Sequence, residues 1–138
     1  MQQRCNFINM KKVRTTKNKA LVLDLIQNIG KAISAPDILE KTQGLCDKVT
    51  IYRVLDRLID EGLIHKVVNP SGRILYASCQ RCTHFNEVHS HQHVHFSCQK
   101  CQTTTCLVQV SPSIQLPVDY LLNEVYLNVS GICPTCNQ

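Results

Sequence analysis

The stretch TIYRVLDRLIDEGLIHKV, residues 50–67, contains the clearest structural pattern of this chain. Its apolar side chains recur at the spacing of one helical face, at Ile51, Val54, Leu55, Leu58 and Ile59. Gly62 then ends the helical pattern, and the apolar run LIHKVV follows it. We therefore predict a helix that begins near Asp47, buries one apolar stripe and leads directly into a strand.

Two further helices are predicted before this stretch. Thr16 caps the first, which ends at Gly30 after apolar residues at helical spacing. Ser34 and Asp37 form a capping box that opens a short second helix, which we expect Gly44 to close. The chain therefore has three helices before its first strand.

A hairpin is predicted after the third helix. The β-rich runs LIHKVV and RILYA flank the turn sequence Asn-Pro-Ser-Gly at residues 69–72. Three helices followed by a two-stranded wing is the order of a winged helix-turn-helix domain.

The formal positive charge lies entirely in the same half of the chain. Residues 1–66 contain 12 Lys and Arg against 7 Asp and Glu, whereas residues 67–138 contain 3 of each. A basic half joined to a neutral half indicates that one part meets a polyanion such as nucleic acid. A solvated helical surface is the alternative explanation of the charge alone.

In a winged helix the third helix enters the major groove, so its exposed residues are candidate DNA contacts. Tyr52 and Arg53 would reach base edges, Arg57 would reach phosphate, and Thr50 lies at the helix start, where free amides attract phosphate. Two alternatives stay open: Arg57 could form an ion pair three or four residues along the helix, and Tyr52 could pack against the wing.

The second half contains the residues of metal sites. Two Cys-x-x-Cys pairs, Cys98/Cys101 and Cys133/Cys136, could complete one four-thiolate zinc site. The string HSHQHVHF before the first pair alternates as a strand does, so it would place imidazoles on one face for a second metal. A pairing of Cys79/Cys82 with Cys98/Cys101 also has zinc-ribbon spacing and stays open on spacing alone.

Length and cysteine usage narrow the class of protein. A chain of 138 residues makes one domain or two small ones that share a metal-stabilised core. Nine cysteines do not form a fully paired disulfide framework, the N-terminus MQQRCNFINMKK lacks the apolar core of a signal peptide, and no apolar run approaches a membrane span. We expect a cytoplasmic protein with reduced thiols and no membrane partner.

The order of these motifs resembles the ferric uptake regulator family of metal-responsive bacterial transcription factors. The resemblance extends from about Arg14 to Cys136 and rests on T-I-Y-R at 50–53, the histidine cluster and C-x-x-C at 89–101, and G-x-C-x-x-C at 131–136. It implies an α+β fold, with a winged helix-turn-helix DNA-binding domain at 1–78 and a small α/β dimerisation and metal-binding domain at 79–138.

The resemblance also implies roles for single residues. Arg14 lies just before the first helix, where family members reach the minor groove with a basic residue. One structural zinc would be held by the cysteines covered by the last two motifs, which are Cys98, Cys101, Cys133 and Cys136.

Particular positions are most similar to the zinc uptake regulator branch of this family. Iron-sensing members have a histidine before the second helix, where this chain has Ala32 and Ile33. In zinc-sensing members a His or Asp follows the motif G-[LF]-[IV], and here His65 follows Gly-Leu-Ile. Those members also have a Cys at the end of the second wing strand, and here Cys79 has that position. Cys106 replaces a common Glu and is a softer ligand that favours zinc over iron(II). The implied regulatory set is His65, Cys79, Cys106 and one or two of His91, His93 and His95.

The implied function is zinc-responsive transcriptional repression by a homodimer that binds a palindromic double-stranded DNA operator. An iron- or peroxide-responsive regulator, with Fe(II) or Mn(II) at the regulatory site, is one alternative, and a non-regulatory zinc-binding module is another. No enzyme and no small-molecule substrate are expected, because residues 67–138 contain three carboxylates and no His-Glu-x-x-His motif.

Overall fold

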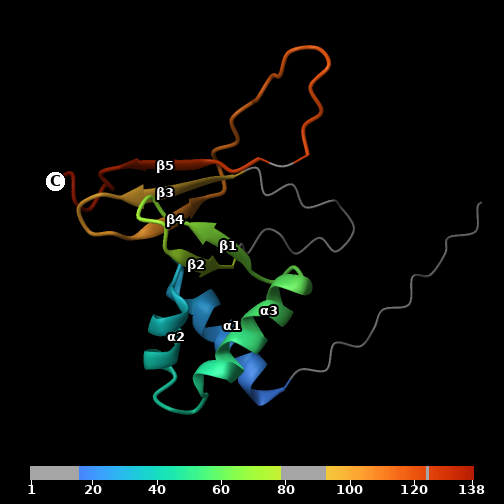
Figure 1. The fold of residues 1–138 in the computed structure, drawn as a ribbon. Helices are drawn as coiled ribbons and strands as arrows, with labels where there is room; N and C mark the ends of the chain where they lie inside the picture. The colour runs from blue at the N-terminus through green and yellow to red at the C-terminus, as the bar shows by residue number, and fades with distance from the viewer. Residues whose placement is uncertain (1–15, 79–92, 124) are drawn as a thin grey trace, which may run out of the picture.

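A computed structural model describes residues 16–78, 93–123 and 125–138. The first described part contains three helices and a two-stranded sheet: α1 (Lys17–Ile29), α2 (Ala35–Lys41), α3 (Lys48–Asp60), β1 (His65–Val68) and β2 (Ile74–Ala77). The second contains a three-stranded sheet of β3 (Val94–Cys98), β4 (Thr104–Leu107) and β5 (Asn128–Gly131), in the order β4-β3-β5. Figure 1 shows the helices on one side of β1 and β2 and the second sheet on the other.

Each helix begins at a side chain that satisfies a free amide of its first turn. Thr16, Ser34 and Asp47 accept hydrogen bonds from the amides of Lys19, Asp37 and Thr50, respectively. α1 ends at Gly30 with a φ of 65°, a left-handed conformation that glycine adopts without a steric cost. These predicted boundaries are confirmed, except that α2 ends at Lys41 with Thr42 as its C-cap, before the predicted Gly44.

The three helices enclose the larger apolar core. The stripe of α3 that the sequence predicted faces inward, and Leu55 and Leu58 have no exposed surface. β1 and β2 pair antiparallel, with His65 opposite Ala77 and Val68 opposite Ile74. The predicted three helices and wing are therefore confirmed, as is the α+β class.

The second sheet combines both strand directions. β3 pairs antiparallel with β4 and parallel with β5. β4 returns the chain antiparallel to β3, and residues 108–127 then lead from β4 past β3 to β5, without a helix in their described part. In both figures this connection extends away from the helices, as the orange to red segment. No described helix is long and apolar enough to span a bilayer.

One backbone hydrogen bond and a small apolar cluster join the halves, and a second backbone contact holds the same segment against the wing. The Ala32 amide donates to the Thr104 carbonyl of β4 at 2.9 Å, and Ile33 forms a β-bridge with Tyr76 of β2. The segment between α1 and α2 therefore lies between the wing and β4. An apolar cluster of Ala32, Val67, Leu75 and Ala77, with Cys106 packed against it, fills the same junction.

Candidate metal centres and nucleic-acid interface

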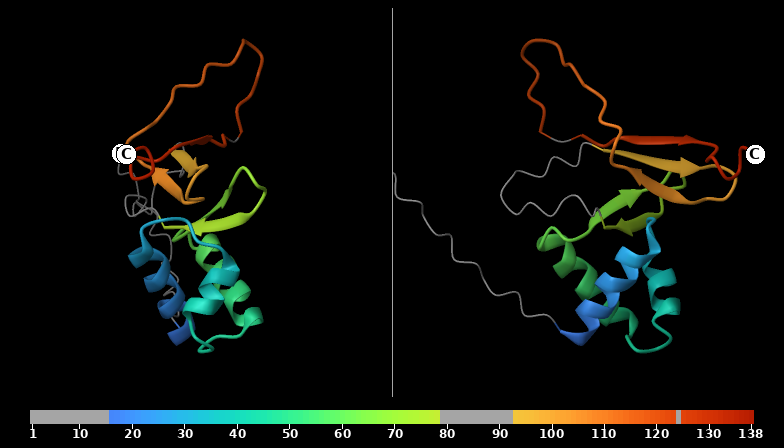
Figure 2. Two further views of the ribbon diagram at one scale, coloured as in Figure 1. Left: turned by 90° about the vertical axis from the view of Figure 1, so that its left-hand side faces the viewer. Right: turned by 180° about the vertical axis from the view of Figure 1, so that it is seen from behind.

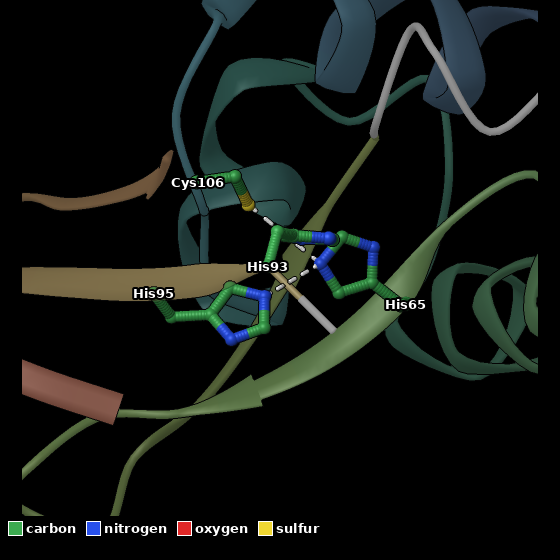
Figure 3. A group of neighbouring side chains, drawn as sticks. All are labelled: His65, His93, His95 and Cys106. Carbon is green, nitrogen blue, oxygen red and sulfur yellow. Dashed lines mark hydrogen bonds between the residues drawn. The ribbon is translucent and has the colours of Figure 1, made fainter. Parts of the chain in front are cut away.

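Four metal-ligand side chains from both halves of the chain meet at the junction (Figure 3). They are His65, His93, His95 and Cys106, and their ligand atoms all lie within 4.8 Å of one another. The three histidines have at most 8% of their surface exposed, and Cys106 is half-buried. We refer to these four residues as the junction cluster.

Strand geometry explains why these four residues meet. His95 of β3 and Cys106 of β4 are opposite each other in the antiparallel register, so their side chains lie on one face of the sheet. His93 lies two residues before His95, and side chains two residues apart in extended chain share a face. His65 is the first residue of β1 and approaches that face from the wing.

The distances in the junction cluster suit one small metal ion. The Nε2 atoms of His65 and His95 are 3.0 Å apart, and His65 Nε2 lies 3.6 Å from the Sγ atom of Cys106. A zinc tetrahedron with bonds of about 2.0 to 2.3 Å has ligand–ligand edges of about 3.3 to 3.8 Å. Three imidazoles and one thiolate form a donor set that zinc accepts and that hard cations such as Mg²⁺ do not prefer.

A second cluster contains only cysteines. Cys98, Cys101, Cys133 and Cys136 also place their sulfur atoms within 4.8 Å of one another, and the Sγ atoms of Cys101 and Cys133 are 3.9 Å apart. The parallel register of β3 and β5 pairs Cys98 with Gly131, so the two Cys-x-x-Cys segments leave the sheet side by side. We refer to these residues as the four-cysteine cluster.

Backbone amides favour the thiolate form at one member of this cluster. The amides of Cys101 and Cys133 donate to Cys98 Sγ at 3.5 and 3.4 Å, and these hydrogen bonds lower the pKa of the Cys98 thiol to about 6. A hydrogen bond with the Cys133 side chain raises the pKa of Cys136 to about 12. Four converging sulfur atoms fit a closed, structural zinc site.

The outward face of α3 displays the predicted DNA contacts. Tyr52, Arg53 and Arg57 are exposed, and Thr50 is half-buried in the first turn. Tyr52 helps to line a shallow hollow of about 150 Å³ made by residues of α2 and α3. In the described part of the chain Glu61 pairs with Lys19, and no ion pair joins Arg57 to Asp60 or Glu61.

The structure brings some of the predicted metal ligands together, and other predicted site residues lie outside the described part of the chain. The structure unites the four predicted cysteines of one cluster and, in the other, His65, His93, His95 and Cys106. Arg14, Cys79 and His91 lie outside the described residues. Sequence reasoning missed the contact of Ala32 with Thr104, since no local pattern indicates which strand an extended linker will meet.

The chain is similar in sequence and in fold to known proteins. No family model matches the chain. Zinc uptake regulation protein from Escherichia coli strain K12 is 24% identical over 132 residues, which cover 90% of this chain and 73% of that protein. The protein of the same name from Shigella flexneri aligns equally well. The resemblance predicted from the sequence motifs is therefore confirmed.

Solved structures show the same architecture. A zinc uptake regulator complexed with zinc and DNA has a TM-score of 0.66 at 22% identity, covering 92% of this chain and 85% of that one. The ferric uptake regulator from Francisella tularensis with iron has a TM-score of 0.59 at 18% identity, covering 100% of both chains. These likenesses show a shared fold.

Proposed function

We propose that the chain is a zinc-responsive transcriptional repressor of the ferric uptake regulator family that binds a palindromic DNA operator as a homodimer. Three observations support the proposal: the resemblance to zinc uptake regulation proteins, the exposed basic residues of α3, and the junction cluster. The junction cluster is the observation that carries it, because its ligands come from both halves of the chain.

The regulatory site in this proposal is the junction cluster. A zinc ion bound there would supply coordination bonds to His65 of the wing and to His93, His95 and Cys106 of the second half. These four described ligands are enough for a tetrahedral sphere, and the predicted ligands Cys79 and His91 lie outside the described residues. The soft Cys106 thiolate favours zinc over iron(II) or manganese(II) at this position.

The residues around the site explain how ligand binding would reach the DNA. His65 keeps its place beside His95 and Cys106 only in one orientation of the wing relative to the second sheet. Cys106 shares β4 with Thr104, whose carbonyl accepts a hydrogen bond from Ala32 just before α2. Fixing β4 against the wing therefore also fixes the segment that leads into the helix-turn-helix.

Thermodynamic linkage turns this fixed orientation into a switch. If the selected state spaces the two recognition helices of a dimer one DNA turn apart, about 34 Å, operator affinity rises. Typical couplings of about 1 to 3 kcal/mol change affinity roughly 5- to 150-fold. DNA then raises the affinity for zinc by the same factor, because the coupling is reciprocal.

We assign a structural role to the four-cysteine cluster and a dimerisation role to the half that contains it. The proposed boundary lies between residues 78 and 79. In the connection between β4 and β5, Val118, Tyr120 and Leu121 are 88%, 69% and 91% exposed, so they are candidates for contacts with a second copy. We place the protein in the cytoplasm, where thiols stay reduced and available to metal, and we propose no catalytic activity.

The test is whether zinc controls DNA binding by the full-length chain. A duplex enriched from a random-sequence pool in the presence of zinc would be labelled, and its affinity measured by fluorescence anisotropy as free zinc is varied in a metal buffer. We expect a gain of about fivefold or more on zinc binding. Affinity that does not change across the zinc titration would refute the proposal.

A further inference from the structure

Exposed apolar side chains gather at the start of α3. Leu45, Val49 and Tyr52 are 72%, 59% and 42% exposed. Within the described residues of the winged half, 16–78, the other exposed large hydrophobic side chains are Val68 and Ile74, which face each other across the wing. Three of these five side chains therefore lie within eight residues of one another, at the end of α3 that a winged helix presents to DNA.

Val49 has no evident role in the fold. The buried stripe of α3 consists of Ile51, Val54, Leu55 and Leu58, and Val49 lies outside it. A β-branched residue is also a weaker helix former than alanine, so local stability does not favour valine at an exposed helical position. A single exposed valine would be unremarkable, but this one belongs to a group at a proposed binding surface.

The neighbours of Val49 define what could cover it. Residues three and four positions along a helix share its face, so Val49 shares a face with Tyr52 and Arg53. Lys48 precedes it, and the exposed Arg53 and Arg57 follow. The major groove offers a partner to both kinds of side chain. The thymine methyl is the apolar group on its base edges and would contact Val49, and the phosphates that border the groove would attract the cations.

We propose that Val49 is a specificity-determining residue that contacts the C5-methyl group of a thymine in the operator. The inference rests on the proposed function, because it needs α3 in the major groove. Val49 has no side-chain donor or acceptor, so it distinguishes bases only through apolar contact. Tyr52 and Arg53 remain free to form hydrogen bonds with neighbouring bases.

The experiment replaces thymines by deoxyuridine, one at a time, in the duplex enriched with zinc. This change removes the methyl group and leaves the hydrogen-bonding edge intact. At one thymine in each half-site the full-length protein should bind roughly fourfold more weakly, as expected when one methyl group loses its apolar contact. For Val49→Ala the same replacement should change affinity by less than about twofold, because alanine lacks the two γ-methyl groups with which valine would reach the thymine methyl.

Two comparisons make the result decisive. Val49→Ala should fold as the wild type does, because the site is exposed and alanine is the better helix former. Val68→Ala removes an exposed valine of the wing and should keep the wild-type response at the same thymine. The inference is overturned, and the proposed function is not, if deoxyuridine has no effect on affinity at any thymine. It is also overturned if deoxyuridine lowers the affinity of the wild type and of Val49→Ala equally. Failure to enrich any duplex with zinc overturns the proposed function and this inference together.

Discussion

The Nε2 atom of His65 lies 3.0 Å from the Nε2 atom of His95, although 30 residues separate the two histidines in the sequence. His65 begins the wing, and His95 belongs to the central strand of the second sheet. Two neutral imidazoles can form one hydrogen bond at this distance, whereas a metal can bind both nitrogens. This pair therefore connects the winged half to the half that contains the thiolates.

Cys106→Ser should abolish the zinc-dependent gain in DNA affinity, which we expect to be about 5- to 150-fold in the wild type. A hydroxyl is a poor ligand for zinc compared with a thiolate, so the junction cluster would lose its soft donor. Zinc content by atomic emission should fall from two per chain to one. Thr105→Ala is a suitable control, because residue 105 lies on the opposite face of β4. Normal zinc response in Cys106→Ser would contradict the regulatory assignment.

Cys133→Ser should remove the zinc of the four-cysteine cluster and the dimer together. The second half is too small for a self-sufficient core, so metal binding contributes to its folding. Metal analysis and analytical ultracentrifugation of the same sample test both effects. Ser130→Ala, an exposed change on the neighbouring β5, should affect neither. A folded dimer of Cys133→Ser that lacks this zinc would show that the cluster is dispensable.

Arg53→Ala should weaken binding to the enriched duplex by about 1 to 3 kcal/mol and leave binding to random DNA nearly unchanged. Arg57→Ala should weaken binding to both duplexes, because a phosphate contact does not distinguish sequences. Arg14→Ala should do the same, because the minor groove that Arg14 is expected to reach distinguishes sequences poorly. Titrations at two salt concentrations separate the two classes, since each lost phosphate contact reduces the salt dependence. If Arg53→Ala lost the same affinity for both duplexes, Arg53 would be a phosphate contact and not a base contact.

Leu121→Asp should shift the protein from dimer to monomer without unfolding it. Leu121 is 91% exposed in the connection between β4 and β5, so its replacement costs the single chain little, whereas a charge buried between two copies is costly. Sedimentation at several protein concentrations measures the change. Gln115→Glu adds the same charge at an exposed polar position of this segment and is the control. An unchanged dimer in Leu121→Asp would place the interface elsewhere.

Asp47→Asn should alter how stability depends on acid. The Thr50 amide donates to the Asp47 carboxylate at 2.7 Å, and this hydrogen bond lowers the pKa of the carboxyl below its ordinary value. Because the folded-state pKa lies below the unfolded-state pKa, the carboxylate stabilises the fold at pH values above the unfolded-state pKa. This contribution is lost as pH falls through the folded-state pKa. Asparagine also caps helices but does not titrate, so the variant lacks this loss.

Urea unfolding of wild type and Asp47→Asn at a series of pH values measures the effect. The difference in free energy of unfolding should move in favour of Asn as pH falls from about 6 to about 3. Protonation of the zinc ligands affects both proteins alike and cancels from the difference. Parallel profiles over this range would show that the Asp47 hydrogen bond contributes no pH dependence.

Local patterns of the sequence determined the helices, the wing and the pairs of cysteines. Caps such as Thr16, Ser34 and Asp47 act on amides three residues away, so their effect is visible in a short stretch of sequence. The apolar stripe of α3 is equally local, because the helical period alone selects the buried face. The Cys-x-x-Cys spacing indicated metal ligands before any fold was known.

Only the tertiary structure decided which separate segments form one site. His65 and Cys106 are 41 residues apart, and their meeting depends on how the wing packs against β4 through Ala32 and the apolar cluster around it. Long-range contacts of this kind depend on the burial of many side chains at once, which no local pattern contains. The exposure of Val49 also needed the structure, since helical periodicity alone could establish only that it lies outside the buried stripe.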